Sequence, residues 1–377
     1  MIKLLIVIPT LDQSGAEKQF ALLASGLPRD EFETQVIALS RGGPFEKVLR
    51  EHQVPVKILK KQGRLDLKNL LQVRNEIRSS RPDVVLSCLF AANSTIRLAT
   101  LGMKPRPITI VSERCVDSWK SGWQRQLDRL LIPRTDRLVG NSESVKQFYQ
   151  ELGLPEEKLS VIPNGVSVPP LPRQTRAELL MEFGLPPETR LIAYAGRLAP
   201  QKGIPHLLWG MQLLRQSNPE TCLLILGDGP ERQNLEQLAR DLEVSPFVRF
   251  VGHRPDAASL LHLIDLFWLA SEFEGMSNSL MEAMACGKPV IVSDIPPNRE
   301  LVQHDQTGYL ISGGDSVGYA QYSRRLIESP DESRRIGQAA AQRMRDEFSV
   351  EKMVSRYAEL LREEVLSAVA ASANPSR

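Results

Sequence analysis

The chain has 377 residues, which is enough for about two domains of ordinary size with a hydrophobic core in each. Its 47 Lys and Arg residues nearly balance its 45 Asp and Glu residues, so the net charge of +2 excludes a protein that binds nucleic acid through a global charge. Four scattered cysteines with no CxxC pair exclude a disulfide framework and a zinc site of the usual spacing, and they favour a reducing cytoplasm: Cys88, Cys115, Cys222 and Cys286.

The first half alternates short apolar segments with helix-like segments, a pattern typical of parallel sheets covered by helices. Residues 4–8 pass into Pro9 and Thr10 without a small-residue cleavage pattern, so we interpret them as a first strand and not as a signal peptide. No apolar stretch is long enough to cross a bilayer. Further strands are expected at residues 34–38, 56–59, 84–86, 108–111 and 137–139.

A second series of strands and helices follows a proline-rich stretch at residues 163–172, where repeated prolines disfavour both helix and central strand. The pattern therefore predicts an α/β protein with two Rossmann-like, doubly wound domains, at residues 1–167 and 188–350, joined by a linker at 168–187. Residues 351–377 are expected to form a last helix with an apolar face and a frayed end. Strands of the second domain are expected at residues 191–194, 222–226, 248–250, 266–269 and 290–292.

Two cations lie where ligands of such folds bind. If the two domains face one another, the carboxyl ends of both sheets line a cleft, and Arg197 and Lys202 enter it from the loop after the first strand of the second domain. Arg grips phosphate oxygens in a planar fork and Lys supplies a point charge, so the pair suits a diphosphate. The chain contains no Asp-x-Asp pair to hold a divalent ion, so we predict no metal site.

Two carboxylates, Glu274 and Glu282, stand eight positions apart where a loop of small residues leads into a short helix that begins near Ser277. If helical throughout, eight positions span about 12 Å, close to the separation of a sugar and a ribose joined by a diphosphate, so one carboxylate could hold each ring. Other interpretations stay open. Ser279 and Glu282 also fit a helix capping box, and the two carboxylates could be the acid and base of a glycoside hydrolase, although the nearby cations argue against that.

Seven short motifs occur in order along the chain. They are Gly15-Ala16-Glu17, Pro163-Asn164-Gly165, Gly196-Arg197-Leu198 with Lys202-Gly203, Gly227-Asp228-Gly229-Pro230, Phe250-Val251-Gly252, the segment from Glu274 to Glu282, and Glu300 with Thr307-Gly308-Tyr309-Leu310. Each motif alone is weak, and Gly227-Asp228-Gly229 equally fits a plain turn. As an ordered set they resemble the retaining GT-B glycosyltransferases of family 4, which transfer a sugar from a nucleotide diphosphate. The resemblance covers nearly the whole chain.

This resemblance implies a donor nucleotide on the second domain, an acceptor on the first, and a terminal helix that crosses back to the first domain. It implies that Arg197 and Lys202 hold the diphosphate, that Glu282 holds the ribose, and that Glu274 holds the donor sugar. It also implies retention of anomeric configuration, the departing phosphate oxygen taking the acceptor's proton, and no cofactor. The remaining donor-binding residues that it implies are Gly15, Val251, Arg254, Gly275, Met276, Ser277 and Asn278.

The chain departs from the family in its first domain. Family members often carry a histidine near the sugar after a strand equivalent to residues 108–111 or the one before it, and here the only histidine of this domain is His52. We therefore expect Glu113 or Arg114 to occupy that space on the acceptor side. Ser14 also stands where a second glycine is common, which alters the approach of the backbone to the donor.

Basic and aromatic residues suggest how an acceptor could be reached. One set combines cations between residues 60 and 81 with interspersed leucines, and a second consists of Trp119, Lys120, Trp123 and Arg125. Such sets can lie against anionic lipid headgroups, but an ordinary amphipathic helix with a solvated basic face fits them as well.

The function predicted from the sequence is transfer of a hexose or N-acetylhexosamine from a nucleotide diphosphate sugar, a UDP-sugar above all, to a surface glycan or its polyprenyl-linked carrier. The enzyme is expected in the cytoplasm, on the inner face of the membrane, without nucleic acid as a partner. Two alternatives have different chemistry or none: a nucleotide-sugar epimerase or hydrolase of the same fold, and a non-catalytic nucleotide-sugar-binding partner of another transferase.

Overall fold

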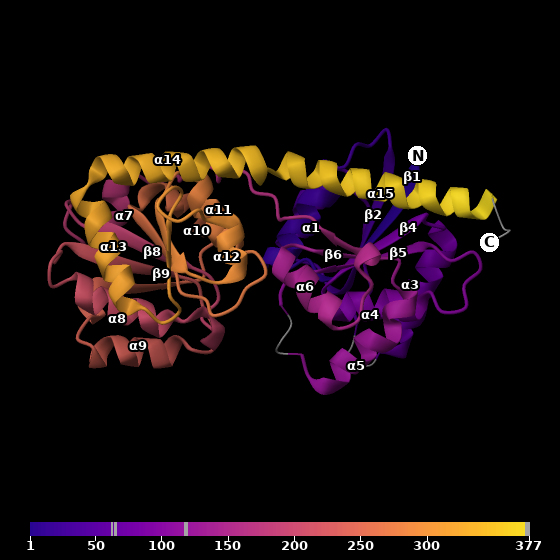
Figure 1. The fold of residues 1–377 in the computed structure, drawn as a ribbon, viewed down its shortest axis with the longest axis horizontal. Helices are drawn as coiled ribbons and strands as arrows, with labels where there is room; N and C mark the ends of the chain where they lie inside the picture. Colours follow the sequence, from indigo (N-terminus) through magenta and orange to yellow (C-terminus); the bar gives the residue numbers. More distant parts are fainter. Residues whose placement is uncertain (62, 64–65, 117–119, 374–377) are drawn as a thin grey trace. The chain divides into compact units, whose positions relative to one another are not determined.

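The computed structural model of the chain describes residues 1–61, 63, 66–116 and 120–373. It divides into two compact units (Figure 1). Unit 1 consists of Met1–Gly165 together with Val350–Arg377, and unit 2 consists of Val166–Ser349. Each unit is an α/β layer structure with its own parallel sheet, as the sequence predicts.

Unit 1 contains a seven-stranded sheet in the order β3-β2-β1-β4-β5-β6-β7. The chain passes from β1 to β2 and β3 on one side and then returns to pair β4 with the other side of β1, so a topological switch point lies between β1 and β4. The apolar run at residues 4–8 is buried throughout, as expected of a strand covered on both faces. The strands are β1 (Ile2–Thr10), β2 (Phe32–Arg41), β3 (Val56–Ile58), β4 (Val84–Cys88), β5 (Ile108–Glu113), β6 (Arg137–Gly140) and β7 (Leu159–Val161).

Helices cover both faces of this sheet, and each face has its own hydrophobic cluster (Figure 1). One cluster is formed with α1 (Gly15–Gly26), α2 (Pro44–Glu51) and α15 (Val350–Ala373). The other is formed with α3 (Leu67–Ser80), α4 (Leu89–Ala99) and α6 (Glu143–Glu151), while α5 (Gly122–Leu131) follows β5. The buried face of α15 carries the residues expected from its helical spacing: Met353, Val354, Tyr357, Leu360 and Leu361.

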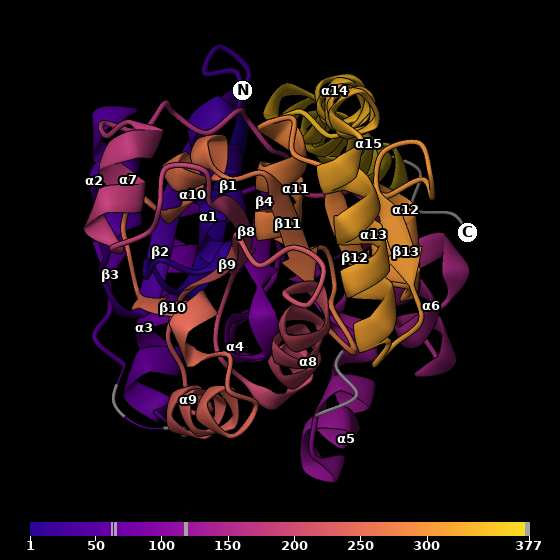
Figure 2. The same ribbon diagram turned by 90° about the vertical axis from the view of Figure 1, so that its left-hand side faces the viewer.

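Unit 2 contains a six-stranded parallel sheet in the order β10-β9-β8-β11-β12-β13, which Figure 2 shows from its edge β10 to its edge β13. Its switch point lies between β8 and β11, because β8 pairs with β9 on one side and with β11 on the other. The strands are β8 (Arg190–Ala195), β9 (Thr221–Leu226), β10 (Val248–Gly252), β11 (Leu266–Leu269), β12 (Val290–Ser293) and β13 (Tyr309–Ile311).

The helices of unit 2 share one large hydrophobic core with its sheet, and its largest buried side chain, Trp268, packs against Tyr319. Among the described residues no helix combines the length and the apolar character needed to span a bilayer. The helices of this unit are α7 (Arg176–Glu182), α8 (Ile204–Leu214), α9 (Arg232–Asp241), α10 (Ala257–Leu260), α11 (Asn278–Ala285), α12 (Pro296–Leu301), α13 (Ser316–Glu328) and α14 (Pro330–Glu347).

The stretch expected as a linker, residues 168–187, lies within unit 2 and contains α7. A capping box starts this helix, since Thr175 accepts a hydrogen bond from the Glu178 amide and the Glu178 side chain accepts one from the Thr175 amide. Leu179 and Leu180 then enter the core of unit 2. The boundary between the units therefore falls at residues 165–166, and the surrounding prolines do not prevent a short packed helix.

Candidate functional site

Three glycine-bearing loops meet at the carboxyl ends of β8, β9 and β10 in unit 2. The Gly227 amide donates a hydrogen bond to the Gly252 carbonyl at 2.8 Å, and the Gly196 amide donates one to the Leu226 carbonyl at 2.9 Å. Gly227 has φ +139°, and a Cβ there would overlap the Gly196 carbonyl oxygen. By sequence, Gly227 also fits a plain turn, but a close backbone contact requires glycine at this position. This contact fixes the loop that carries Arg197.

The Lys202 loop is docked on the loop that follows β11. A single 3₁₀ turn, Pro200–Lys202, ends at Gly203 in the left-handed conformation with φ +58°, and α8 begins there. The Glu272 amide donates a hydrogen bond to the Gln201 carbonyl at 2.9 Å. A Cβ on Gly203 would overlap the Ala270 carbonyl oxygen, so only glycine allows this approach. The backbone thus brings together two loops on the two sides of the switch point between β8 and β11.

Lys202 and Glu274, two predicted site residues, form an ion pair in this place. Both side chains are mostly buried, at 17% and 13% exposed. The Ser271 hydroxyl donates a hydrogen bond at 2.8 Å to Glu274 Oε1, the same oxygen that contacts the ammonium. Burial, together with the nearby charge of Glu274, raises the pKa of Tyr194, so this residue stays a neutral donor. The result is a preorganised charged pair at the carboxyl end of the sheet.

Arg197 lies in the same connection between β8 and α8, and its side chain is exposed. Its backbone is fixed, because the Tyr194 hydroxyl donates a hydrogen bond to the Arg197 carbonyl at 3.0 Å. Within the described part of the chain its guanidinium has no hydrogen-bonding or ionic partner. Arg197 thus has a fixed backbone and a guanidinium without a partner among the described residues, an arrangement that suits recognition of an anion.

Helix α11 begins at Asn278, with Ser277 as N-cap, whose hydroxyl accepts a hydrogen bond from the Leu280 amide at 3.5 Å. The prediction of a helix start near Ser277 is confirmed. The assumption that the stretch from Glu274 is helical throughout is wrong, since Glu274 precedes the helix by four positions and Gly275 and Met276 form a buried loop. The capping-box interpretation is also wrong, because with Ser277 as N-cap the third helical position is Leu280 and not Glu282. Glu282 lies further along the helix and is half-buried.

Arg254, expected near the nucleotide base, is engaged in two ion pairs. It contacts Glu182 of α7 at 2.7 Å and Asp256 at 2.9 Å. The hydrogen bond from Arg254 lowers the pKa of Asp256 below its ordinary value, so the pair stays charged at neutral pH. Arg254 thus fastens the loop after β10 to α7, and neighbouring Val251 is partly buried against the core.

In unit 1, Gly15 begins α1 directly after the β1 loop. This loop is held by Glu17, which is 4% exposed and accepts hydrogen bonds from the hydroxyls of Thr10, at 2.8 Å, and Ser14. Two residues after Glu17, Gln19 exchanges two hydrogen bonds with the backbone of Gly165, both at 2.9 Å. The sequence predicts no role for Gln19, and the only local sign of one is a polar side chain on an otherwise apolar helix face.

Glu113 lies in a buried charge cluster of two cations and two carboxylates. Lys120 Nζ lies 3.4 Å from Glu113 Oε1 and 3.0 Å from Asp128 Oδ2, and Arg97 lies 2.6 Å from the other oxygen of Asp128. The Lys120 side chain is 0% exposed and also donates to the Tyr149 hydroxyl at 2.7 Å. Both interpretations of Lys120, as a lipid-facing cation and as part of a solvated basic face, are therefore wrong. Glu113 itself is 3% exposed, at the carboxyl end of β5.

The other acceptor-side candidates are placed differently. Arg114 donates hydrogen bonds to Asn164 at 2.8 Å and to the Tyr357 hydroxyl at 3.0 Å, and it stacks over Phe20, so it joins the end of β5 to α15. Trp123, on α5, is 58% exposed and meets Phe90 edge to face, with ring centroids 5.7 Å apart. Trp119 lies outside the described residues.

No three His, Cys, Asp or Glu side chains cluster as metal ligands would, within the ranges that the structure describes. The residues that converge at the carboxyl end of the sheet of unit 2 are instead an ion pair, an exposed guanidinium and a helix N-terminus. A helix N-terminus and a nearby Arg are the groups that proteins use to bind phosphate.

Comparison with known proteins identifies the family. Residues 176–343 match the family described as glycosyl transferases group 1, and residues 13–168 match glycosyltransferase family 4. The glycogen synthase of Mycobacterium tuberculosis is 31% identical over 301 residues, which cover 75% of this chain and 69% of that enzyme. The chain therefore belongs to the group 1 glycosyltransferases of family 4, and it is a transferase.

Two further relatives are matched over different shares of their length. The N-acetyl-alpha-D-glucosaminyl L-malate synthase of Bacillus anthracis is 29% identical over 231 residues, which cover 61% of this chain and only 60% of that enzyme. The lipopolysaccharide core biosynthesis glycosyltransferase LpsE of Rhizobium meliloti is 25% identical over 359 residues, which cover 92% of this chain and 95% of that protein.

A solved structure of Anabaena Alr3699/HepE in complex with UDP and glucose matches this chain with a TM-score of 0.85. The two are 23% identical, and the match covers 96% of this chain and 100% of that chain. This likeness shows the fold, which is the two-domain GT-B fold that the sequence predicts.

Proposed function

We propose that this glycosyltransferase moves a hexose or N-acetylhexosamine from a UDP-sugar to a glycan or lipid-linked glycan, with retention of anomeric configuration. The observation that carries the proposal is the ion pair of Lys202 and Glu274, seated between two interlocked loops at the switch point of unit 2. A cation and a carboxylate held side by side suit a substrate in which a diphosphate and a hydroxyl-bearing sugar are adjacent.

Lys202 and Arg197 are proposed to hold the diphosphate. As the bond between the sugar's anomeric carbon and the phosphate oxygen breaks, negative charge grows on the diphosphate, and cations already in place stabilise that charge without reorganisation. No metal ion is part of this proposal. The N-terminus of α11 and the backbone from Gly275 to Asn278 add amide donors to the same anion.

The two carboxylates are proposed to hold the two rings of the donor. Glu274, fixed by Ser271 and Lys202, accepts hydrogen bonds from hydroxyls of the donor sugar. Glu282 accepts them from the ribose. Retention follows when the acceptor hydroxyl attacks from the face that the phosphate leaves: the new carbon–oxygen bond forms, the old one breaks, and the departing phosphate oxygen takes the hydroxyl proton.

The names of related proteins support the choice of donor and acceptor. The Anabaena structure holds UDP and glucose, and LpsE is named for lipopolysaccharide core biosynthesis. We therefore place a UDP-sugar first among donors and a surface glycan or its lipid carrier first among acceptors. A cytoplasmic enzyme that touches the inner face of the membrane fits the exposed side of α5, which carries Trp123, Arg125, Arg129 and Leu130.

Product analysis tests the proposal against its alternatives. The enzyme is incubated with a UDP-sugar and a glycan acceptor, and the products are resolved by chromatography and NMR. A new glycosidic bond of the same anomeric configuration as the donor supports the proposal. An epimerised or hydrolysed sugar without transfer identifies the epimerase or hydrolase, and binding without any product identifies a non-catalytic partner.

A further inference from the structure

Unit 1 carries a hollow at the end of its sheet opposite to the loops of Gly15 and Glu113. It has a volume of about 970 Å³ and is lined by the loops that lead into β4 and β5, the end of α3 and the last turns of α15. In a parallel sheet, the loops that precede the strands lie at one end of the sheet, and the loops that follow the strands lie at the other end. The hollow is thus separate from the carboxyl end of this sheet, where the Gly15 loop and Glu113 lie.

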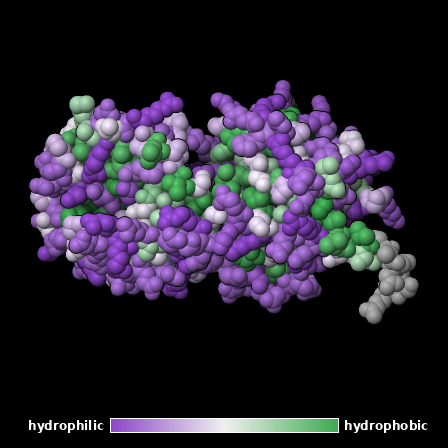
Figure 3. Space-filling view, turned by 90° about the horizontal axis from the view of Figure 1, so that it is seen from above, coloured by the Kyte–Doolittle hydropathy of each residue, from purple (hydrophilic) through white to green (hydrophobic). Residues whose placement is uncertain are grey.

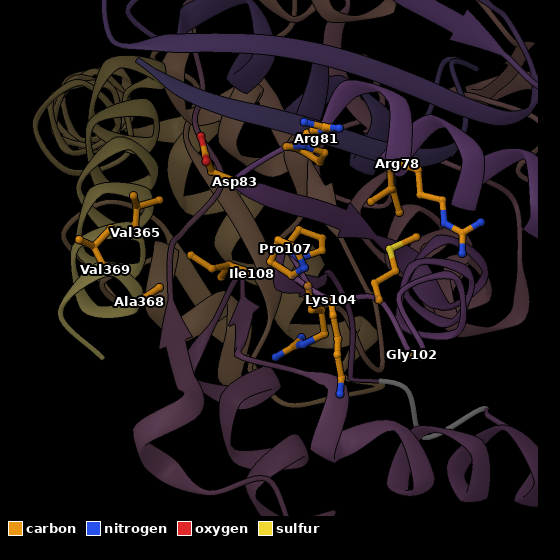
Figure 4. Close-up of a pocket in the computed structure, with 15 residues that line it drawn as sticks. Arg78, Arg81, Asp83, Gly102, Lys104, Pro107, Ile108, Val365, Ala368 and Val369 are labelled. Atoms are coloured by element: carbon orange, nitrogen blue, oxygen red, sulfur yellow. The ribbon is translucent and has the colours of Figure 1, made fainter. Parts of the chain in front are cut away.

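Three cations around this hollow are uncommitted. Arg78, Arg81 and Lys104 are all exposed, and their side chains have no hydrogen-bonding or ionic partner among the residues that the structure describes. Figure 4 shows Arg81 and Arg78 at the upper and right margins of the hollow and Lys104 below. Three like charges around one hollow repel each other, so an anion that enters it relieves this repulsion.

The other charged groups of the hollow do not cancel these cations. Arg106 makes a bidentate contact with Asp136, at 2.6 and 2.8 Å, and is neutralised by it. Asp83 accepts a hydrogen bond from the Lys3 amide at 2.8 Å. With three free cations and this one carboxylate, the lining carries a net charge of +2.

One wall of the hollow is apolar and continues into an exposed apolar rim. Val365 and Val369 of α15 lie on the side opposite Arg78 (Figure 4). Val369 is 62% exposed, Leu366 beside it is 68% exposed, and Leu101 from the loop before Lys104 is 40% exposed. Figure 3 shows hydrophobic atoms gathered at this end of α15. Apolar side chains left in water at the edge of a cationic hollow indicate a ligand with both characters.

We propose that this hollow binds the phosphate headgroup of an anionic phospholipid, with the three cations on the phosphate and the first part of the acyl chain against Val365 and Val369. A phosphate alone would satisfy the cations but leave the apolar wall exposed, whereas a lipid covers both. Through this site, unit 1 is anchored to a membrane at the amino-terminal end of its sheet. The proposal does not depend on which sugar is transferred.

Calorimetric titration with a soluble short-chain phosphatidic acid, and with inorganic phosphate for comparison, tests the site. The parent protein binds the lipid more tightly than inorganic phosphate. The variant Arg78→Gln/Lys104→Gln loses two charged hydrogen-bonding groups and binds the lipid at least about tenfold more weakly. A control, Lys47→Gln/Lys68→Gln, removes two exposed cations of unit 1 outside the hollow and keeps the parent affinity. Equal affinity of all three proteins, or no binding by the parent, overturns the proposal.

Two further measurements distinguish the lipid from a free phosphate as the source of the ligand. Val369→Ser, at an exposed position, weakens binding of the lipid and leaves binding of inorganic phosphate unchanged; if it changes neither, the apolar part of the proposal is wrong. In flotation, the parent rises with phosphatidylglycerol vesicles and not with phosphatidylcholine vesicles, and the Arg78→Gln/Lys104→Gln variant does so less. If the parent binds inorganic phosphate as tightly as the lipid and stays with the soluble fraction, a free phosphate and not a membrane occupies the hollow.

Discussion

Gly203 and Ala270 lie so close together that a single added methyl group on the glycine would overlap the alanine's carbonyl oxygen. Gly203 also has φ +58°, a conformation that other residues adopt at a cost. This contact holds the Lys202 loop against the loop that leads to Glu274. The ion pair between these residues therefore depends on a backbone contact that only glycine permits.

We expect Gly203→Ala to destabilise the protein and to reduce its activity. Gly184→Ala is a matched control, because Gly184 has φ +63° and nothing lies within 4 Å of an added Cβ. The control is expected to cost about 1 kcal/mol from backbone strain alone, and Gly203→Ala about 2 kcal/mol more from the overlap. Chemical unfolding of both variants measures this difference. Equal stabilities would show that the two loops can separate without cost.

Lys202→Ala is expected to lower turnover by about 10²- to 10³-fold, as removal of a group that stabilises transition-state charge does elsewhere. A smaller loss of stability, about 1–2 kcal/mol, is expected as well, because Glu274 is mostly buried and loses its cation but keeps its hydrogen bond from Ser271. Arg240→Ala, which removes an exposed cation at the end of α9, serves as the control and keeps parental turnover. A Lys202→Ala enzyme as fast as the parent would remove the lysine from the reaction.

The buried cluster around Lys120 leads to a prediction about stability. Lys120→Met removes one cation and leaves Glu113 short of its positive partner inside the protein, which is expected to cost about 3–5 kcal/mol. Lys47→Met is the control, because Lys47 forms only an exposed ion pair with Glu51, and a change within about 0.5 kcal/mol is expected there. Equilibrium unfolding in urea compares the two variants. If Lys120→Met lost no more stability than Lys47→Met, Glu113 would not require a cation beside it inside the protein.

The pH dependence of unfolding tests Glu332. Hydrogen bonds from Arg325 and from the Tyr309 hydroxyl lower the pKa of Glu332 below its ordinary value. The unfolded state then binds more protons than the folded state in acid, so this stabilisation is complete above the ordinary glutamate pKa and is lost as the pH falls through the lowered folded value.

The variant Glu332→Gln is expected to show a shallower loss of stability in acid than the parent, since it lacks this proton uptake. Its neighbour Asp331, whose side chain is 95% exposed, provides the control Asp331→Asn, which should keep the parental slope. Melting temperatures recorded between about pH 3 and pH 7 give the comparison. Parallel curves for Glu332→Gln and the parent would contradict the assigned cause of the shift.

Most of the strands and both parallel sheets could be predicted, because central strands buried on both faces appear as uninterrupted apolar runs. The short edge strands could be predicted only in part. β3 is expected from the sequence, but β7 and β13, which also have three residues each, are not, because so short an apolar run is hard to distinguish from loop sequence. The prolines around helix α7 make it hard to predict, although the spacing of Thr175 and Glu178 has the signature of a capping box.

At the candidate site, residue types predicted the chemistry but not the pairing. That Lys202 contacts Glu274 depends on the crossing of two loops 72 positions apart, which no local pattern encodes. For Lys120, the local sequence suggests the wrong environment. Its tryptophan neighbours are typical of a lipid-facing segment, but its ammonium lies between two buried carboxylates, one from β5 and one from α5.

Calorimetry can show whether Arg197 and Lys202 hold the diphosphate of the donor. The affinity for a nucleoside diphosphate is compared with the affinity for its nucleoside, using UDP and uridine and the corresponding GDP and ADP pairs. The parent is expected to bind one diphosphate much more tightly than its nucleoside, and Arg197→Ala/Lys202→Ala is expected to lose that advantage while still binding the nucleoside. A double variant that keeps the full preference for the diphosphate would contradict the claim that these two cations hold it.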